Sequence, residues 1–183
     1  MKIVENEIRL IAPRELEKFF IYLNDHLSDS GKEGTPLFQP LSRNDSRLPK
    51  EKEESFSKGL SIPVGQAGWR RVWIAVDQNE EILGHIDLRA HTDQYTEHRA
   101  LLGMGVDRKY RREGLGKRLI ETVTSWAASK TAIEWIDLWV LSSNAPAVHL
   151  YKSTGFQKLG EVDDMFRIDG SSEAYTLMTK GIR

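Results

Sequence analysis

The spacing of apolar residues divides the chain into segments that alternate with period two, as strands do, and segments with helical spacing. Strands are predicted over residues 8–11, 72–76, 82–88, 99–106, 134–141, 156–162 and 174–179. Helices are predicted from Pro13 to about Leu27, near 53–60, from about 114 to 129, and from Asn144 to Gly155. The polar turn at 77–80 makes the second and third strands an antiparallel hairpin.

The order of these segments indicates the fold class. The strands come first as a meander and later alternate with helices, which predicts a mixed α/β sheet. Between Ser28 and Gly68 the sequence is polar and irregular, apart from the short helix near 53–60. Loops this long inside a compact domain are more often functional than idle. We therefore expect this stretch to take part in the function.

Length, composition and net charge limit the kinds of binding partner that we expect. A length of 183 residues fits a single domain over 1–183, and 29% charged with 39% apolar residues is typical of a globular protein. The formal net charge is only -1, so no global field holds the chain on nucleic acid or on an anionic membrane. We predict neither a nucleic-acid nor a membrane partner.

The chain has no cysteine, which excludes disulfides, thiolate metal sites and cysteinyl thioester intermediates. Charged residues interrupt the first ten positions, so no signal peptide is indicated and a cytoplasmic location is expected. No metal is expected either, because no paired ligand spacing occurs among the histidines at 26, 85, 91, 98 and 149.

The segment between the third predicted strand and its following helix has an unusual composition. Gly114 and Gly116 each weaken a helix start by up to about 1 kcal/mol relative to alanine. Arg111, Arg112 and Lys117 place positive charge at the positive end of the helix dipole. A bound anion removes both costs, since backbone N–H groups and cations then face phosphate oxygens. The segment therefore indicates a diphosphate ligand. The alternative is a solvated basic turn whose glycines only shape the corner.

Four motifs in order make the resemblance to a known family specific. They are Met104-Gly105-Val106, Arg111-Arg112-Glu113-Gly114-Leu115-Gly116, Asn144-Ala145-Pro146-Ala147-Val148-His149-Leu150-Tyr151 and Gly155-Phe156. From about Val72 to Thr179 the chain resembles the GNAT acetyltransferase superfamily. The resemblance implies an α/β (α+β) fold with a mixed, mostly antiparallel central sheet flanked by helices. It also implies a cofactor-binding core over 72–179 and acceptor-side helices and loops over about 12–71.

The resemblance assigns acetyl-CoA as co-substrate and gives residues their roles. The strand at Met104, Gly105 and Val106 would pair with the pantetheine arm, and Asn144 would lie beside the cofactor. Tyr151 would lie beside the thioester sulfur and protonate it as it leaves. The pyrophosphate would be held by the turn residues Arg111, Arg112, Glu113, Gly114, Leu115, Gly116 and Lys117. Two structural alternatives stay open: Asn144 could be only a helix N-cap, and Tyr151 could be only a core aromatic.

The identity of the general base is open. A free amine titrates near pH 10, so at neutral pH a base must take its proton. Family members often carry a glutamate on the strand before the turn, but here Arg99–Gly103 contains none. Asp87 and His85 share one face of the preceding strand and are the candidates, with a structural role as the alternative for each. A backbone N–H near Val106 would stabilise the oxyanion.

We therefore expect an acyltransferase that passes an acetyl group directly to a primary amine of a small molecule, an amino acid or a protein N-terminus. The alternative is a non-catalytic acyl-CoA-binding sensor or scaffold, and a homodimer is left open. The region 163–170 resembles that of members acting on free amino acids, small amines or protein N-termini. A strongly acidic groove typical of polyamine binding is not evident, although it could draw on Glu53, Glu54, Asp163 and Asp164.

Overall fold

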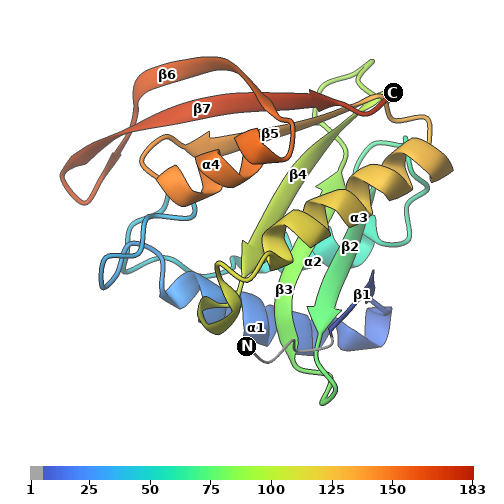
Figure 1. Ribbon diagram of the computed structural model, residues 1–183, viewed down its shortest axis with the longest axis horizontal. Coiled ribbons are helices and arrows are strands. Elements are labelled where there is room, and N and C mark those ends of the chain that lie inside the picture. The colour runs from blue at the N-terminus through green and yellow to red at the C-terminus, as the bar shows by residue number, and fades with distance from the viewer. Residues whose placement is uncertain (1–5) are drawn as a thin grey trace.

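A computed structural model describes residues 6–183 as seven strands of one sheet with helices on both faces (Figure 1). The strands are β1 (Glu7–Leu10), β2 (Arg70–Val76), β3 (Ile82–Arg89), β4 (Arg99–Val106), β5 (Trp135–Leu141), β6 (Gln157–Ile168) and β7 (Ser171–Gly181). The α-helices are α1 (Leu16–Ser28), α2 (Lys50–Gly59), α3 (Leu115–Lys130) and α4 (Ala145–Ser153), and 3-10 turns cover Pro13–Glu15 and Arg108–Tyr110.

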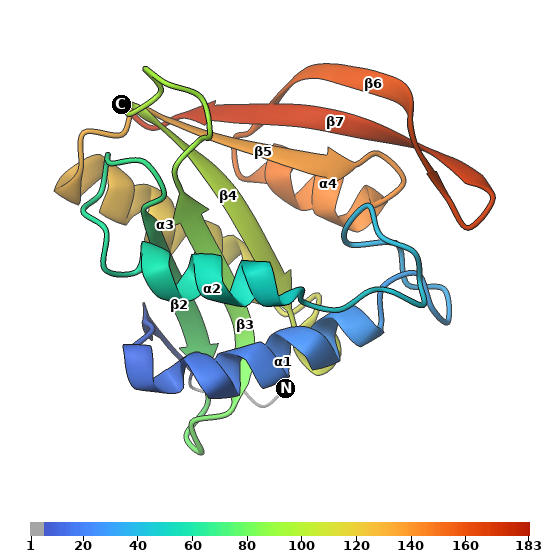
Figure 2. The same ribbon diagram turned by 180° about the vertical axis from the view of Figure 1, so that it is seen from behind.

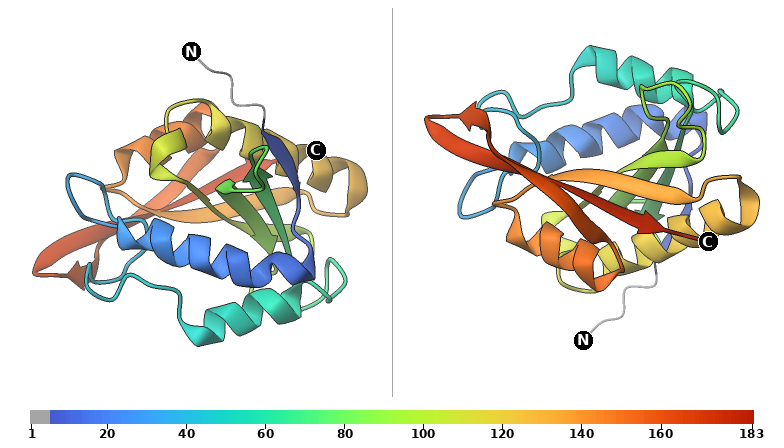
Figure 3. Two further views of the ribbon diagram at one scale, coloured as in Figure 1. Left: turned by 90° about the horizontal axis from the view of Figure 1, so that it is seen from below. Right: turned by 90° about the horizontal axis from the view of Figure 1, so that it is seen from above.

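The sheet order is β1-β2-β3-β4-β5-β7-β6, and every neighbouring pair is antiparallel except β4 with β5. The predicted class, a mixed and mostly antiparallel sheet flanked by helices, is confirmed. Helices α3 and α4 cover one face, and α1 and α2 cover the other (Figures 1 and 2). The two further views show the sheet between these layers (Figure 3). None of the helices within 6–183 is long and apolar enough to cross a membrane.

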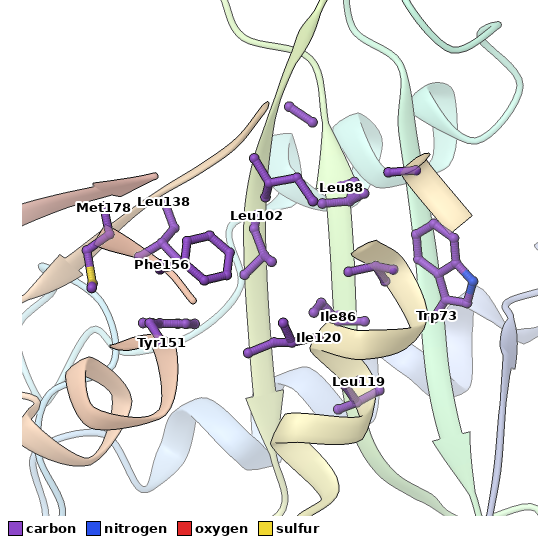
Figure 4. Close-up of a cluster of buried hydrophobic side chains, with 14 of the residues drawn as sticks. Trp73, Ile86, Leu88, Leu102, Leu119, Ile120, Leu138, Tyr151, Phe156 and Met178 are labelled. Carbon is purple, nitrogen blue, oxygen red and sulfur yellow. The ribbon is translucent and has the colours of Figure 1, made fainter. Parts of the chain in front are cut away.

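Two apolar layers explain why the central strands are apolar on both faces. Val72 and Ile74 of β2 pack against Phe19 of α1 and Phe56 of α2. The other face forms the larger core, in which residues of α3 and α4 meet the sheet (Figure 4). The labelled members of that core are Trp73, Ile86, Leu88, Leu102, Leu119, Ile120, Leu138, Tyr151, Phe156 and Met178.

Strands β4 and β5 pair only at their start and then diverge. Their parallel register joins 99–101 to 135–137 and does not extend further along either strand. Beyond Leu101, therefore, the edge of β4 that faces away from β3 has no strand beside it among the described residues. This divergence places an unpaired backbone edge in the middle of the sheet.

A buried carboxylate links β4 and β5 at the point where the two strands begin to diverge. Asp137 on β5 accepts hydrogen bonds from Arg99 Nε at 2.7 Å, from Arg99 Nη2 at 2.6 Å and from Thr179 Oγ1 at 2.6 Å. His91 Nε2 lies 3.0 Å from its second oxygen. Burial alone would raise the pKa of Asp137, but the hydrogen bonds from Arg99 and Thr179 outweigh it and the pKa is lowered. The cluster ties β4, β5 and β7 together.

Replacing Asp137 by alanine should destabilise the fold by about 3 kcal/mol, because it leaves Arg99 without its buried partner. The folded-state pKa of Asp137 is depressed, so its contribution is complete above the unfolded pKa and is lost as the pH falls through the folded value. The difference between wild type and variant in urea unfolding should be full at neutral pH and shrink only in strong acid. Asp93→Ala, at an exposed position, should change stability by no more than about 0.5 kcal/mol. An equally mild Asp137 variant would contradict this role.

The last two strands are longer than their apolar pattern predicted. The predicted bounds 156–162 and 174–179 were too short, and residues 163–168 continue β6. Almost every β6 side chain is exposed, so no buried face imposes an alternating pattern. The turn Asp169-Gly170 has φ of 50° and 81° at its two residues, as tight hairpins require. Helix α2 likewise begins at Lys50, earlier than predicted, and takes in the charged run.

Candidate functional site

The diverging part of β4 offers unpaired backbone groups. Asp107 N–H donates to Leu83 O at 2.9 Å, and the same register pairs Gly105 with His85. Antiparallel hydrogen bonds join alternate residues, so the amide groups of Met104 and Val106 point away from β3. The carbonyl of Val106 accepts from Arg111 Nε at 3.0 Å. Both groups of Met104 and the N–H of Val106 are left for an extended ligand that carries amides.

The N-terminus of α3 lies just beyond this edge and lacks a cap. Gly114 is its N-cap, with φ of 82°, a conformation that favours glycine, and no side chain bonds the free amides. The first intrahelical bond is donated by Arg118 N–H to Gly114 O, which leaves the N–H groups of Leu115, Gly116 and Lys117 unpaired within the helix. Three N–H groups therefore converge on one spot.

Charge distinguishes this helix from the others. The first turns of α1 and α2 carry acidic residues, and α4 is capped by Asn144, whereas α3 has no acid in its first turn. Arg112 and Lys117 are exposed beside it, and Arg112 has the left-handed φ of 66°. Such a φ costs a residue with a side chain of order 1 kcal/mol and is concentrated at functional sites. Uncapped amides flanked by cations fit a diphosphate.

Arg111 is oriented differently from its neighbours. Its guanidinium bonds Val106 O, lies 5.1 Å from the Phe38 ring centroid, and has Nη2 3.6 Å from Asp29 Oδ2. The side chain therefore braces the end of β4 against the segment that follows α1. One of its side-chain nitrogens, Nη2, is buried without a hydrogen-bond partner. Glu113 is exposed.

Gly116 sits where three elements meet. A Cβ at this position would lie 2.9 Å from Leu150 Cδ2 on α4 and 3.4 Å from Met104 Cε on β4. The turn, α4 and the diverging strand are thus in direct contact. Both glycines of the turn also have a structural reason, because Gly114 needs its φ and Gly116 needs the space.

Tyr151 lies on α4 between the two diverging halves of the sheet (Figure 4). The residue is 8% exposed, and its ring packs edge-on against Phe156 at 5.7 Å. Its hydroxyl makes no hydrogen bond with another of the residues 6–183. Burial raises the pKa of Tyr151, so the hydroxyl remains protonated at neutral pH and is available as a proton donor. The position suits both a core aromatic and an acid next to a ligand along β4.

Asn144 is a helix N-cap. Its Oδ1 accepts from Ala147 N–H at 3.2 Å, and its Nδ2 donates to Leu37 O at 3.3 Å. An amide NH₂ has two hydrogens, so one donor is left over. The capping alternative is thus present in the structure and is compatible with a ligand contact.

The two candidate bases, Asp87 and His85 of β3, lie over the other face of β4. A Cβ on Gly103 would lie 2.7 Å from Asp87 Oδ1, and one on Gly105 would lie 2.8 Å from His85 Cε1. The two glycines leave room for the side chains of β3 to lean over β4. Asp87 is 3% exposed, and its Oδ2 accepts from Arg89 Nη1 at 3.1 Å. Its Oδ1 makes no hydrogen bond within the described residues.

A further histidine, His26 of α1, lies on this face, although the sequence analysis did not select it as a candidate base. A Cβ on Gly105 would lie 2.5 Å from His26 Nε2, and the imidazole stacks on Phe38 at 4.7 Å. Its Nδ1 is buried without a hydrogen-bond partner. Burial lowers the pKa of both His26 and His85 to about 3, so both are neutral. His26 follows Phe19 and Leu23 at helical spacing, so the buried face of α1 could have pointed to it, but its approach to Gly105 depends on how α1 packs on β4.

The side chains considered for an acidic groove do not form one. Glu53 and Glu54 line a surface hollow of about 290 Å³ together with Lys50 and Lys58, so its charges balance. Asp164, on β6, is engaged by Arg167 and Ser172. Within residues 6–183, no group of three or more histidine, aspartate or glutamate side chains is placed to hold a metal ion.

The sequence profile of the acetyltransferase (GNAT) family matches residues 41–156, which include the free edge of β4, the α3 turn and Tyr151. The chain belongs to this family. An acetyltransferase of the GNAT family from Streptococcus pneumoniae superposes with a TM-score of 0.80, at 24% identity over 98% of this chain and 100% of that one. The Vibrio cholerae spermidine N-acetyltransferase in complex with CoA and spermine gives 0.72, at 18% identity over 96% and 95%. Both show the GNAT fold.

Curated relatives match over shorter stretches. The L-amino acid N-acetyltransferase AaaT of Escherichia coli is 25% identical over 53% of this chain and 54% of its own length. The N-alpha-acetyltransferase RimI of Mycobacterium tuberculosis is 34% identical over 40% of this chain and 44% of its own. The chain thus spans about half the length of these relatives.

Proposed function

We propose that this GNAT family member transfers the acetyl group of acetyl-CoA directly to a primary amine. The observation that carries the proposal is the uncapped, cation-flanked N-terminus of α3 next to the free edge of β4. The first feature fits a pyrophosphate, and the second fits the amides of a pantetheine arm. No other helix within 6–183 combines these features.

The predicted residues divide into three groups around acetyl-CoA. Met104, Gly105 and Val106 supply the strand edge along which the arm lies. Asn144 contributes its remaining N–H from the start of α4. The pyrophosphate is held by the backbone of the turn and by two side-chain cations, within the set Arg111, Arg112, Glu113, Gly114, Leu115, Gly116 and Lys117.

The reaction needs a base for the amine, a donor that stabilises the oxyanion, and an acid for the departing sulfur. Asp87, through its free Oδ1, accepts one proton from the ammonium, and the neutral amine then forms the new C–N bond with the acetyl carbon. The nitrogen loses its second proton to solvent as the tetrahedral intermediate collapses. A backbone N–H of β4 near Val106 stabilises the oxyanion. The C–S bond breaks, and Tyr151 donates its proton to the departing sulfur before solvent restores it. His85 and His26 are the alternative bases, since both are neutral and lie over Gly105.

The acceptor is a primary amine of a small molecule, an amino acid or a protein N-terminus. The names of the relatives AaaT and RimI, an L-amino acid and an N-alpha-acetyltransferase, support this range. The second candidate function is an acyl-CoA-binding sensor or scaffold without turnover. The absence of a glutamate on β4 favours it, whereas Tyr151 at the divergence favours the enzyme.

Thiol release from acetyl-CoA over a panel of amines tests the proposal. We expect amine-dependent release, with initial-rate lines that intersect when the amine is fixed at several concentrations. Direct transfer requires a ternary complex, and the chain has no cysteine to hold the acetyl group. Parallel lines with a stable acetyl adduct in mass spectrometry would indicate a covalent intermediate. Tight acetyl-CoA binding without release for any amine would favour the sensor.

A cytoplasmic location and a homodimer remain predictions. Strand β6 has one strand neighbour, β7, among the described residues and exposes Leu159, Val162 and Met165. A second copy of the chain could cover them.

A further inference from the structure

Two arginines face each other directly across β2 and β3, on the face covered by α1 and α2. Arg70 pairs with Arg89, and Ala90 N–H donates to Trp69 O at 3.0 Å, so the adjacent pair 70/89 is the non-hydrogen-bonded kind. Side chains approach most closely in such pairs. Like charges directly opposite each other are destabilising. The arrangement therefore needs anions nearby.

Asp87 supplies only one negative charge. Its Oδ2 lies 3.1 Å from Arg89 Nη1 and 3.7 Å from Arg70 Nη1. Lys52 of α2 adds a third cation. Partial burial, followed by the charges of Arg89 and Arg70, lowers the pKa of Lys52, and the charge of Asp87 opposes this. The cluster carries two positive charges in excess.

Arg70 is the second and independent sign of a ligand. Its side chain is 7% exposed, and its guanidinium stacks on Phe56 at 3.9 Å. Its five N–H donors make no hydrogen bond with any side chain or carbonyl in 6–183. Asp87 lies at ion-pair distance, but buried donors are almost always also hydrogen-bonded, and those of Arg70 are not. An anion that accepts from Arg70 satisfies these donors.

The distance along β4 from this cluster to the proposed site of acetyl transfer limits the size of the acceptor. A Cβ on Gly103 would lie 3.1 Å from Arg89 Nη1 and 2.7 Å from Asp87 Oδ1, so both groups sit over β4 at Gly103. Gly105 and Val106, next to the N–H that is proposed to stabilise the oxyanion, follow two and three residues later. At the rise of a strand this is roughly 7 to 10 Å. A hydrogen bond of about 3 Å to a guanidinium at one end and an attack distance of roughly 3 Å at the other take up most of this span. The acceptor therefore carries its anionic group only a few bonds from its amine.

We infer that the acceptor is a free amino acid, whose carboxylate is bound by Arg89 and Arg70 and whose ammonium faces Oδ1 of Asp87. The carboxylate of Asp87 lies between the cations of Arg89 and Arg70, so the cluster can bind both the ammonium and the carboxylate of a zwitterion. Guanidinium groups bind carboxylates in a fixed and often bidentate geometry. The excess of positive charge repels polyamines, and a protein N-terminus has no carboxylate beside its amine. The inference rests on the proposed function.

Matched acceptors and an arginine variant test it. Thiol release is measured with alanine, methionine and phenylalanine, with their primary amides, and with spermidine. Wild type should prefer each acid to its amide. Arg89→Gln should raise KM for the acids about 10- to 100-fold more than KM for the amides and thereby abolish the preference. Because Arg89 also donates to Asp87, the ratio of kcat/KM for each acid to kcat/KM for its amide is the readout, not the absolute rate. Comparing the preference between the two proteins cancels the different basicity of acid and amide amines.

Arg89→Lys, which keeps the charge without the planar fork, should retain part of the preference. Arg14→Gln, at an exposed arginine, should retain all of it. Preference for amides or spermidine in wild type, or an unchanged preference in Arg89→Gln, overturns the inference while leaving acetyl transfer standing. If no amine releases thiol, acetyl transfer fails instead. Calorimetry with CoA present then decides: methionine binding that needs Arg89 supports the site, and no binding overturns it.

Discussion

Replacing Tyr151 by phenylalanine should lower turnover about 100- to 10,000-fold while acetyl-CoA affinity stays within twofold. The substitution removes only the hydroxyl, and the edge-on packing of the ring against Phe156 is kept. Burial raises the pKa of Tyr151, so the lost group is a protonated hydroxyl at any pH near neutral. Turnover is measured by thiol release, and affinity by calorimetry.

The matched control for Tyr151 is Tyr95→Phe, since Tyr95 is 83% exposed and should be silent. A general acid has a further signature, because its loss depends on the leaving group and should be smaller for a thioester whose thiol is more acidic. A merely structural tyrosine would lower the melting temperature without that dependence. Turnover within twofold of wild type would mean that solvent protonates the sulfur and that Tyr151 serves the core.

The sequence predicted most of the fold because most elements bury one face. Helix α3 shows its apolar spacing through Leu115, Leu119 and Val123, all buried. Strand β6 exposes both faces, so periodicity could show only part of it. The Asp169-Gly170 turn was the remaining local signal. Elements are thus readable from sequence to the extent that burial imposes a pattern on them.

The parts of the candidate site also differ in how far the sequence alone could reveal them. The α3 turn is contiguous, so its glycines and cations stand together in the sequence. Asp87 and His85 could be selected because alternate residues of a strand share a face. The pairing of Arg70 with Arg89, and the approach of His26 to Gly105, depend on register and on how α1 packs. Neither leaves a trace in residue spacing.

The α3 turn is best tested at Lys117 rather than at a glycine. A glutamate at Gly116 would collide with Leu150, and its effect on binding would be mixed with one on packing. Lys117 is exposed and makes only a surface ion pair with Glu121 at 3.8 Å, which is worth little. An acidic residue in the first turn of a helix is normally stabilising by about 0.3 to 1 kcal/mol.

Lys117→Glu should therefore keep or slightly raise the melting temperature and weaken acetyl-CoA binding about 10- to 100-fold, by replacing attraction with repulsion at the phosphates. Stability and binding are expected to move in opposite directions, which a loss of fold cannot mimic. The control is Lys130→Glu at the other end of the 16-residue helix, roughly 20 Å away, with the same charge change. Its affinity, measured by calorimetry, should stay within twofold. Equal affinity of Lys117→Glu and wild type would remove the pyrophosphate from this turn.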